Sequence, residues 1–413
     1  MAGDPWPEWV ATGAPIESVP GGIMLGRTAI LCSCMALLPC AQAAADPPPY
    51  SPVTITVTPT KLASVDDVSY TGRYVVGGAP KARLQLRDIR TGKRLVRLPK
   101  SATAASLSQN GRYLTYAMPV GDWARRKILL YDRKRDRTTN ITRRSGGKIL
   151  KPSWKGTCTP ATCGEGQKLT DEPQLRGGQI SGDGRYVVFS ANFRKPAVID
   201  VYVKNLKTGK LQIFKGVGQL LNSEGVTEYV QAPSISGDGS VILIPGRLDS
   251  DKNECTWGPG RALFDRSRVV DIDGVGNTIT RDGRIISISG GPTGSSYRTP
   301  DDVVWYDVGT GVSTPADPVG MRMSRVSAST DGRYVFWRLQ PADPLQLRDR
   351  LLGVSYDLEA ALAGAGYVPD RYVGYQGGYL WGSLSSDAGI SGDGRTIFLI
   401  TQFEGIVKVT WTP

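Results

Sequence analysis

One arrangement of polar and hydrophobic positions recurs along the chain. Small polar residues and a glycine precede a run of β-branched, aliphatic or aromatic residues in seven segments, which read YTGRYVVGG, QNGRYLTYA, GDGRYVVFS, GDGSVILIP, RDGRIISIS, TDGRYVFWR and GDGRTIFLI. The turn glycines are Gly72, Gly111, Gly184, Gly239, Gly283, Gly332 and Gly394. Glycine gives the backbone the freedom that a tight turn needs, and the run after it suits a buried strand. Each segment therefore predicts a strand, a turn and a second strand.

A second pattern follows four of these segments. It is a strand that ends near Asp or Asn and leads into another strand, as in LQLRDIRTGKRLVRL, ILLYDRKRDRTTNIT, VYVKNLKTGKLQIF and VVWYDVGTGVSTP. The Thr-Gly pairs at Thr91-Gly92, Thr208-Gly209 and Thr310-Gly311 stand where a hairpin needs a left-handed residue. Each unit thus supplies four short strands. Residues 357–366, DLEAALAGAG, depart from this and predict a short helix between the third and fourth strands of the sixth unit.

The spacing of the units predicts the fold class. Successive turn glycines lie between 39 residues (72 to 111) and 73 residues (111 to 184) apart, which brackets the length of one propeller blade. After Gly394 the chain has room for two more strands but not three, whereas residues 53–58 form an alternating strand ahead of the first unit. We therefore predict an all-β, seven-bladed β-propeller of four-stranded antiparallel blades, in which residues 53–58 complete the last blade and leave no open edge.

The first 52 residues predict export rather than fold. Arg27, an apolar run over residues 29–38 and the small residues Ala41 and Ala43 have the anatomy of a secretory signal peptide, and the apolar run is too short to span a bilayer. We assign residues 1–23 to an upstream extension, 24–45 to the signal peptide, 46–52 to a linker and 53–413 to one propeller domain. A lipid anchor at Cys40 is the alternative to free secretion, so we expect a secreted or envelope-associated protein.

The repeat resembles the TolB-like family, which is related to WD-type propeller repeats. The blades of that family carry a small residue, Asp-Gly-Arg, an aromatic-aliphatic strand and later a strand pair of the form VYV.(D/N)L.TGK. Residues 180–214 of this chain match that pattern throughout, and the resemblance covers residues 53–413. It implies the fold and says little about function, because the fold hosts many roles. We expect neither the N-terminal domain of TolB nor an attached hydrolase domain.

Composition narrows the chemistry that the chain can perform. The 413 residues include no histidine, which removes Ser-His-Asp and Cys-His catalysis and histidine-ligated metal sites. The formal net charge is +12 with both signs spread along the chain, which favours anionic partners but matches no nucleic-acid motif. Enzymatic activity stays uncertain, a non-catalytic role is favoured, and no residue is predicted to be catalytic.

Three segments are candidate sites. Aromatic residues and an arginine are interleaved with glycines in residues 369–381, a composition that suits protein or sugar recognition, although the same rings could pack between blades. Together with Trp257 the binding candidates are Arg371, Tyr372, Tyr375, Tyr379 and Trp381. We predict that they lie on the face of the propeller that carries the long loops.

The other two segments concern calcium and a disulfide. Asp249, Asp251 and Asn253 alternate as in the first half of a calcium loop, but Glu254 stands where such a loop has glycine, so an Asx turn is the alternative. Cys158 and Cys163 are the candidate disulfide, because export exposes Cys158, Cys163 and Cys255 to an oxidising compartment. This pairing leaves Cys255 as a single thiol. Apart from a possible calcium ion, we predict no cofactor.

These observations favour an exported, non-catalytic propeller that recognises a protein or an anionic envelope polymer through its long-loop face. The alternative is a carbohydrate-active enzyme, lyase or glycosidase-like, that uses carboxylates and Tyr at the channel mouth. We expect a monomer with no nucleic-acid partner and no transmembrane helix in the mature chain.

Overall fold

The computed structural model describes residues 53–79, 83–120, 122–143, 147–153, 173–195, 198–217, 232–244, 248–249, 256–257, 260–265, 267–272, 278–283, 285–288, 304–315, 325–338, 346–367, 388–401 and 405–412. The chain divides into two units, Met1–Pro47 and Pro48–Pro413, and all of these residues belong to the second.

Four-stranded antiparallel sheets make up the described part of the chain, and seven of them can be counted there. In sheets 1 to 3 the strands pair in chain order. Sheet 1 contains β2 (Asp67–Val68), β3 (Tyr74–Ala79), β4 (Arg83–Asp88) and β5 (Lys93–Arg97); sheet 2 contains β6 (Thr103–Leu107), β7 (Tyr113–Val120), β8 (Asp122–Asp132) and β9 (Arg137–Asn140); sheet 3 contains β10 (Leu175–Ile180), β11 (Tyr186–Lys195), β12 (Val198–Asn205) and β13 (Leu211–Phe214).

Sheets 4 to 6 repeat this order, with one hairpin inserted into sheet 4. Sheet 4 contains β14 (Ser234–Ile235), β15 (Val241–Ile244), β18 (Gly260–Phe264) and β19 (Arg268–Ile272), and β16 (Leu248–Asp249) pairs with β17 (Thr256–Trp257) between β15 and β18; sheet 5 contains β20 (Thr278–Ile279), β21 (Ile285–Ile288), β22 (Val304–Asp307) and β23 (Val312–Pro315); sheet 6 contains β24 (Arg325–Ala328), β25 (Tyr334–Arg338), β26 (Gln346–Asp349) and β27 (Val354–Asp357).

Sheet 7 combines the two ends of the described chain. It contains β28 (Ala388–Ile390), β29 (Thr396–Thr401), β30 (Gly405–Thr412) and, as its fourth strand, β1 (Thr54–Pro59). β1 runs antiparallel to β30 from Thr54 opposite Thr412 to Pro59 opposite Val407. The pairing predicted for residues 53–58 is therefore present.

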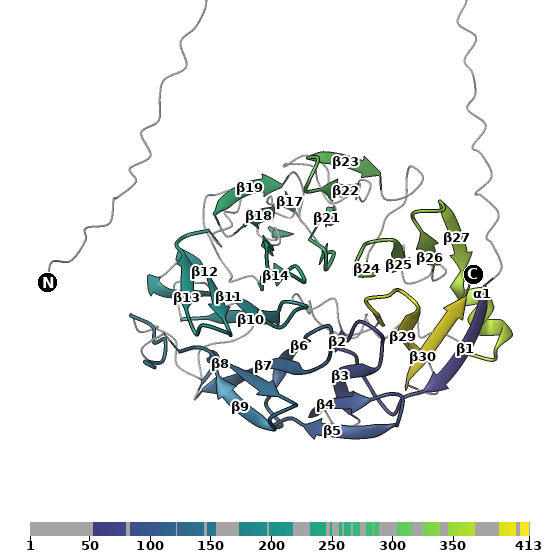
Figure 1. The fold of residues 1–413 in the computed structure, drawn as a ribbon, viewed down its shortest axis with the longest axis horizontal. Coiled ribbons are helices and arrows are strands. Elements are labelled where there is room, and N and C mark those ends of the chain that lie inside the picture. The colour runs from purple at the N-terminus through teal and green to yellow at the C-terminus, as the bar shows by residue number, and fades with distance from the viewer. Residues whose placement is uncertain are drawn as a thin grey trace, which may run out of the picture. The chain divides into compact units, whose positions relative to one another are not determined.

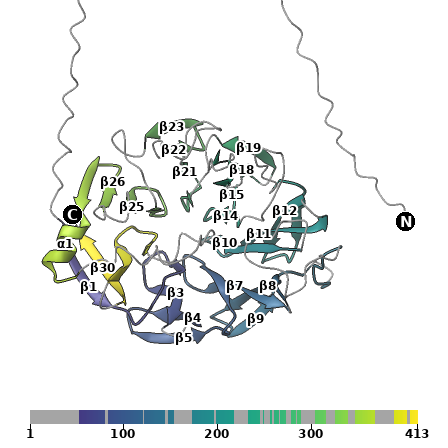
Figure 2. The same ribbon diagram turned by 180° about the vertical axis from the view of Figure 1, so that it is seen from behind.

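The sheets are arranged around a common centre (Figures 1 and 2). First strands such as β2, β6, β10 and β14 lie innermost, and fourth strands such as β5, β9 and β19 lie on the outside. Second strands are buried on both faces, as all four residues of β15 are. Clusters of buried apolar side chains lie between neighbouring sheets; Val68 and Val75 of sheet 1, for example, pack with Phe398 and Ile406 of sheet 7. The hydrophobic runs of the sequence thus form a series of cores between sheets.

The single helix of the described residues, α1 (Leu358–Gly364), corrects one sequence prediction. It follows β27 and therefore leads from sheet 6 towards sheet 7 rather than joining the third and fourth strands of sheet 6. Residues 350–353 connect the third and fourth strands of sheet 6. Asp349 caps this turn by accepting from the backbone N–H groups of Leu351 and Leu352. The side chain of Asp357 caps the helix by accepting from the N–H of Ala360.

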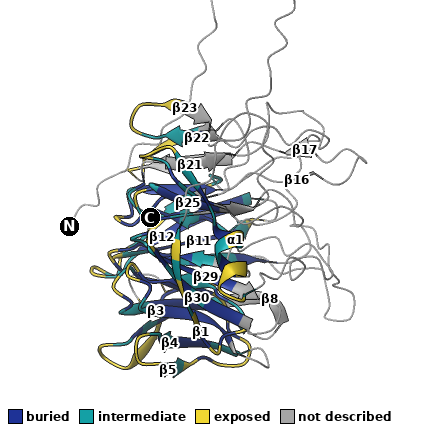
Figure 3. Ribbon diagram, turned by 90° about the vertical axis from the view of Figure 1, so that its right-hand side faces the viewer, coloured by how far each residue is buried: buried dark blue, intermediate teal, exposed yellow. Residues whose placement is uncertain are grey.

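Antiparallel pairing places two kinds of turn at the same end of every sheet. We call the connection between first and second strands the inner turn and the connection between third and fourth strands the outer turn. Figure 3 shows exposed turns, among them the β22–β23 turn, along one side of the sheets. The connections from second to third strands and from one sheet to the next lie at the other end.

Candidate functional site

The inner turns share one set of hydrogen bonds. In sheet 3 the hydroxyl of Ser181 donates to the carboxylate of Asp183 (2.6 Å) and accepts from the backbone N–H of Tyr186 (2.9 Å). Gly184 adopts a φ of 72° between them. The pairs Ser108–Asn110, Ser236–Asp238, Thr280–Asp282, Ser329–Asp331 and Ser391–Asp393 repeat the side-chain contact. The Asp-Gly stretches are therefore turns, and their carboxylates are used within the turn.

The residue after each turn Ser or Thr connects one inner turn to the next. Its carbonyl oxygen accepts a backbone N–H from the inner turn of a neighbouring sheet. The bonds run from Tyr70 N to Gln109 O (2.8 Å), Gln109 N to Gly182 O (2.8 Å), Asp183 N to Gly237 O (2.8 Å), Gly237 N to Arg281 O, Asp282 N to Thr330 O (3.0 Å), Thr330 N to Gly392 O (2.8 Å) and Asp393 N to Tyr70 O (2.9 Å). These seven bonds pass through all seven sheets and return to the first. We call them the turn cycle.

Side chains of the turn cycle lie close to its glycines. A Cβ on Gly392 would lie 2.5 Å from Thr330 Oγ1 and 2.5 Å from Cδ2 of Tyr70. A Cβ on Gly182 would lie 2.7 Å from Cδ of Gln109. Because the large residues of the cycle occupy this space, the positions between them must be glycine.

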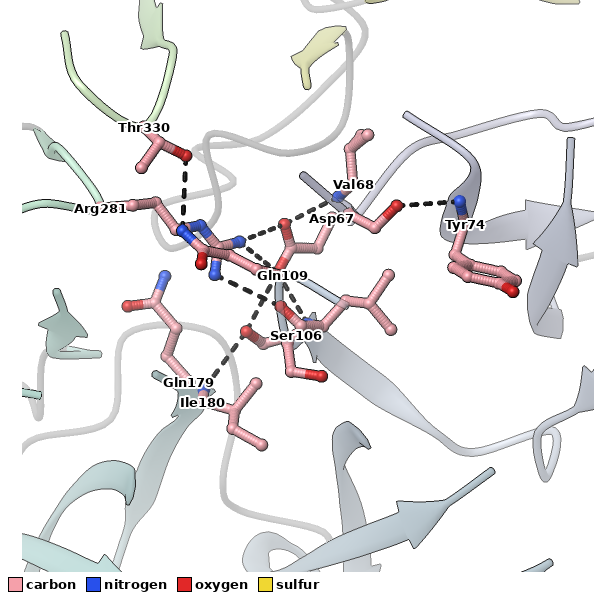
Figure 4. Close-up of polar contacts among 12 residues, drawn as sticks. Asp67, Val68, Tyr74, Ser106, Gln109, Gln179, Ile180, Arg281 and Thr330 are labelled. Atoms are coloured by element: carbon pink, nitrogen blue, oxygen red, sulfur yellow. Dashed lines mark hydrogen bonds and ion pairs between the residues drawn. The ribbon is translucent and has the colours of Figure 1, made fainter. Parts of the chain in front are cut away.

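A second layer of polar contacts closes the free edges of the innermost strands (Figure 4). The residue two places before the turn Ser reaches the next sheet: Asp67 Oδ2 accepts from the N–H of Leu107 (2.7 Å), Ser106 Oγ from the N–H of Ile180 (3.3 Å) and Gln179 Oε1 from the N–H of Ile235 (2.6 Å). An unpaired strand edge with such N–H groups would be costly to bury. Polar residues in the innermost strands are thus structural.

Sheet 7 has no polar side chain at this position, and a side chain of sheet 1 bonds the N–H group that would otherwise lack an acceptor. Gly389 occupies the corresponding position, and a Cβ there would lie 2.9 Å from Cγ2 of Val68. The N–H of Val68 is satisfied instead by Oδ1 of its own neighbour Asp67 (2.7 Å). Asp67 therefore serves two strand edges, one on each side.

Arg281 is the one basic side chain among the residues of the turn cycle, and it reaches from sheet 5 to sheets 1 and 2. Its guanidinium donates to Oδ1 of Asp67 (3.1 Å) and to the carbonyl of Leu107 (3.3 Å). The side chains of Arg281 and Asp67 are 22% and 19% exposed, so the ion pair is largely shielded from water. Figure 4 shows this contact beside Gln109, whose Nε2 approaches the hydroxyl of Thr330. The arrangement ties opposite sides of the centre together.

Asp66 is the carboxylate of this region with a perturbed acidity. Partial burial raises its pKa to about 6, the neighbouring Asp67 adds to the rise, and the N–H of Ala105 (3.2 Å) opposes it. A pKa near neutrality is common in catalytic acids but also arises in structural carboxylates. The other described carboxylates with a shifted pKa, Asp88, Asp132, Asp238 and Asp349, have it lowered, and we assign Asp66 no catalytic role.

Arginine–aspartate pairs link inner turns to outer turns. Arg333 of the Asp-Gly-Arg turn donates to Asp349 at the end of β26 (2.7 Å), and the Asp349 side chain is fully buried. Burial alone would raise the pKa of Asp349, but the bond from Arg333 and two backbone N–H groups hold it below its ordinary value. Arg73–Asp88 and Arg112–Asp132 repeat the pair in sheets 1 and 2. In sheets 1, 2 and 6 the arginine of the sequence repeat thus fastens the third strand.

Most predicted site residues lie outside the described residues. This holds for Arg371, Tyr372, Tyr375, Tyr379, Trp381, Asp251, Asn253, Cys158 and Cys163. Asp249 and Trp257 belong to the β16–β17 hairpin, where Asp249 pairs with Thr256 and Trp257 with Leu248. That hairpin joins second and third strands, so it lies at the end opposite the inner turns.

The described residues hold neither a metal-binding cluster nor a membrane-spanning helix. They contain no group of three or more Cys, Asp or Glu side chains placed to hold a metal ion. Within the same ranges no helix is long and apolar enough to cross a membrane.

Sequence reasoning missed the centre of the molecule, although a signal was available. Arg281 is the one charged residue among those that directly follow the turn Ser or Thr of the seven repeats. Asp67 stands two places before a turn serine, where the next two repeats have Ser106 and Gln179. Aligning the repeats by their glycines would have brought these positions together.

Comparison with known proteins supports a β-propeller fold. No protein-family model matches the chain, and no curated protein does. Among solved structures it is similar to an oligogalacturonate lyase in complex with manganese, with 13% identity, a TM-score of 0.52 and coverage of 87% of this chain and 91% of the lyase. It also matches Kuenenia stuttgartiensis hydrazine synthase, with 13% identity, a TM-score of 0.46 and coverage of 86% and 97%. At this identity the likeness to the lyase concerns the fold alone, and with the four-stranded sheets it defines the chain as a β-propeller protein.

Proposed function

We propose that this chain is a closed, seven-bladed propeller of the TolB-like kind that is exported and acts as a non-catalytic binding scaffold. The turn cycle is the observation that carries the proposal. Its seven backbone hydrogen bonds return to the sheet where they begin, and the strand that precedes the first blade pairs with the last strand of the chain. A ring of sheets joined in this way leaves only short, protected strand edges.

The turn cycle also favours one end of the channel as the binding end. At the inner-turn end the backbone groups are bonded from sheet to sheet, and the side chain of Arg281 crosses the centre to Asp67. The connections at the opposite end are long in sequence, as residues 141–174 between β9 and β10 are. Loops on a rigid scaffold are where binding residues concentrate. We therefore assign partner recognition to that end.

The partner that fits best is a protein or an anionic polymer of the cell envelope. The leader anatomy of residues 24–45 supports export, and the net charge of +12 supports an anionic partner. The aromatic residues of the segment 369–381 supply contact area and hydroxyl groups for such recognition.

Capture from envelope material tests this proposal. The tagged protein is crosslinked at the cell surface, and the attached material is compared between the unmodified chain and a Tyr372→Ala, Tyr375→Ala, Trp381→Ala variant. Val269→Ala, which changes an exposed residue of β19 that belongs to no proposed binding surface, is the control. Capture should fall in the triple variant and stay unchanged in the control. Equal capture by both variants would contradict the assignment of the aromatic segment.

Enzymatic activity is the competing outcome. The likeness to the lyase supplies a fold and no residue set, and a chain without histidine lacks the commonest proton-transfer group. Incubation of the purified protein with a panel of acidic polysaccharides decides the question. Cleavage of any of them would overturn the non-catalytic proposal.

A further inference from the structure

The outer turns differ sharply between the two sides of the molecule. In sheets 1 to 3 they carry exposed cationic side chains: Arg90, Lys93, Lys134, Arg135, Arg137, Lys207 and Lys210. Arg135 has a side chain that is 74% exposed, and its ion pair with Asp132 is long at 3.9 Å. All of these turns lie at the same end of the sheets, next to the inner turns.

The acidic side chains of the same three turns do not balance this charge. Asp88 and Asp132 are buried and paired with Arg73 and Arg112, and Asn205 takes the equivalent place in sheet 3. Asp136 is the exposed carboxylate of these turns, and it accepts from the hydroxyl of Tyr131 (2.8 Å). The aspartates of the inner turns lie nearer the centre and accept bonds within their own turns. The outer turns of sheets 1 to 3 therefore form a cationic arc.

The outer turns of sheets 5 and 6 expose large apolar side chains instead of cationic ones. Leu351 and Leu352 are 73% and 59% exposed, and Val312 is 53% exposed. The leucines are held outward, because their N–H groups both bond to Asp349. The neighbouring Arg350 lies over the ring of Trp305, 4.7 Å from its centroid, and leaves the tip of the turn to the leucines.

We propose that this end of the molecule, formed by the cationic arc and the apolar tips, docks on an anionic membrane surface. A lipid bilayer with acidic headgroups offers both contacts in one plane: phosphate charge for Lys and Arg, and a hydrocarbon boundary for the leucines. A soluble polyanion would use the arc but leave the leucines in water. The inference is independent of the proposed function, since partner recognition is assigned to the opposite end, which docking would turn away from the membrane.

Vesicle co-sedimentation of the full chain tests the docking. Phosphatidylcholine vesicles with and without phosphatidylglycerol are used at low and at high salt. The unmodified chain should bind only the anionic vesicles, and high salt should weaken the binding because exposed charges are screened. No binding to anionic vesicles would overturn the proposal.

Matched variants locate the surface. Lys134→Glu with Arg135→Glu should lower the affinity about tenfold or more, and Leu351→Ser with Leu352→Ser should lower it by roughly fivefold. Lys100→Glu with Lys148→Glu makes the same change of charge, and Ile149→Ser the same kind of polar change, at exposed residues of the opposite end. These controls should bind like the unmodified chain. Equal losses in the controls and the outer-turn variants would contradict the proposal.

A soluble competitor separates the membrane from a polymer. Soluble polyphosphate should bind the unmodified chain and the leucine variant equally, whereas anionic vesicles should distinguish them. If the leucine substitutions leave vesicle binding unchanged, the surface binds polyanions and the membrane assignment is wrong. All changed residues are exposed, and thermal unfolding of each variant verifies that it is folded.

Discussion

Inner and outer turns lie at the same end of the sheets, yet they use their residues in opposite ways. The inner turns repeat one chemistry: in every sheet Ser or Thr precedes a glycine with positive φ, an Asp or Asn stands between them in all sheets but the first, and backbone bonds join each turn to the next sheet. The outer turns of sheets 1, 2, 3, 5 and 6 share only an Asp or Asn cap, and their exposed residues change from Lys and Arg in sheets 1 to 3 to Leu and Val in sheets 5 and 6. Repetition marks residues that the fold needs, and variation marks residues that are free to meet a partner.

A glycine pair from sheet 3 should show the largest difference between the two kinds of turn. Gly184 and Gly209 have φ values of 72° and 71°, but a Cβ on Gly184 would lie 2.5 Å from Cδ2 of Tyr113, whereas nothing lies within 4 Å of one on Gly209. Gly184→Ala should lower the free energy of unfolding by about 3 kcal/mol or more, through strain and overpacking. Gly209→Ala should lower it by about 1 kcal/mol through strain alone. Urea unfolding measures both, and equal losses would remove the distinction.

Removing a carboxylate should also cost more stability at the centre, at Asp67, than in an outer turn, at Asp136. Asp67→Ala leaves the N–H groups of Val68 and Leu107 and the guanidinium of Arg281 without their acceptor, which should cost about 2–3 kcal/mol. Asp136→Ala removes an exposed contact of an outer turn and should change stability by less than about 0.5 kcal/mol. Thermal unfolding compares them, and a small effect at Asp67 would show that the central contacts do not stabilise the fold.

The raised pKa of Asp66 predicts a dependence of stability on pH. The folded protein binds the proton more tightly than the unfolded chain does, so the contribution of Asp66 is fully present below about pH 3.8 and is lost as pH rises through about 6. Asp66→Asn stays neutral and keeps an oxygen for the N–H of Ala105. It should therefore raise stability at pH 7 by on the order of 1 kcal/mol, because the partial exposure screens the effect, and should bring no gain at pH 3.5. An equal gain at both pH values would exclude titration of Asp66 as the cause.

The cationic arc should show the smallest effect on stability. Lys207→Ala and Lys210→Ala remove exposed side chains of the sheet 3 outer turn and should each change the free energy of unfolding by less than about 0.5 kcal/mol. Chemical denaturation provides the measurement. A loss above 1 kcal/mol at either position would place that lysine among the structural residues.

The sequence predicted local features better than contacts across the centre. The inner turns and the Thr-Gly hairpins at Thr91-Gly92 and Thr208-Gly209 could be predicted, because glycine conformation and strand period act over a few residues and recur in each unit. The pairing of β1 with β30 could be predicted by counting strands, because the last unit lacks its fourth strand. The Arg281–Asp67 pair joins residues 214 positions apart and depends on how the sheets face one another, which no local pattern contains. The position of α1 was mistaken because the DRLLGV turn of sheet 6 lacks the Thr-Gly signal of its neighbours.

The residues at the two ends of the sheets differ in what the structure describes. At the inner-turn end the polar residues contact one another and stabilise the fold. The aromatic segment, the calcium candidate and the cysteine pair remain predictions from composition, because nine of their residues lie outside the described part of the chain.

Hydrogen–deuterium exchange is the most direct measurement of the central claim, that the turn cycle joins all seven sheets into one ring. The bonded N–H groups of Tyr70, Gln109, Asp183, Gly237, Asp282, Thr330 and Asp393 should exchange only through large-scale unfolding. Amides in exposed outer turns, such as that of Lys134, should exchange far faster. If the amide at any one of the seven junctions exchanges as fast as the outer turns do, the ring is open at that junction and the account is wrong.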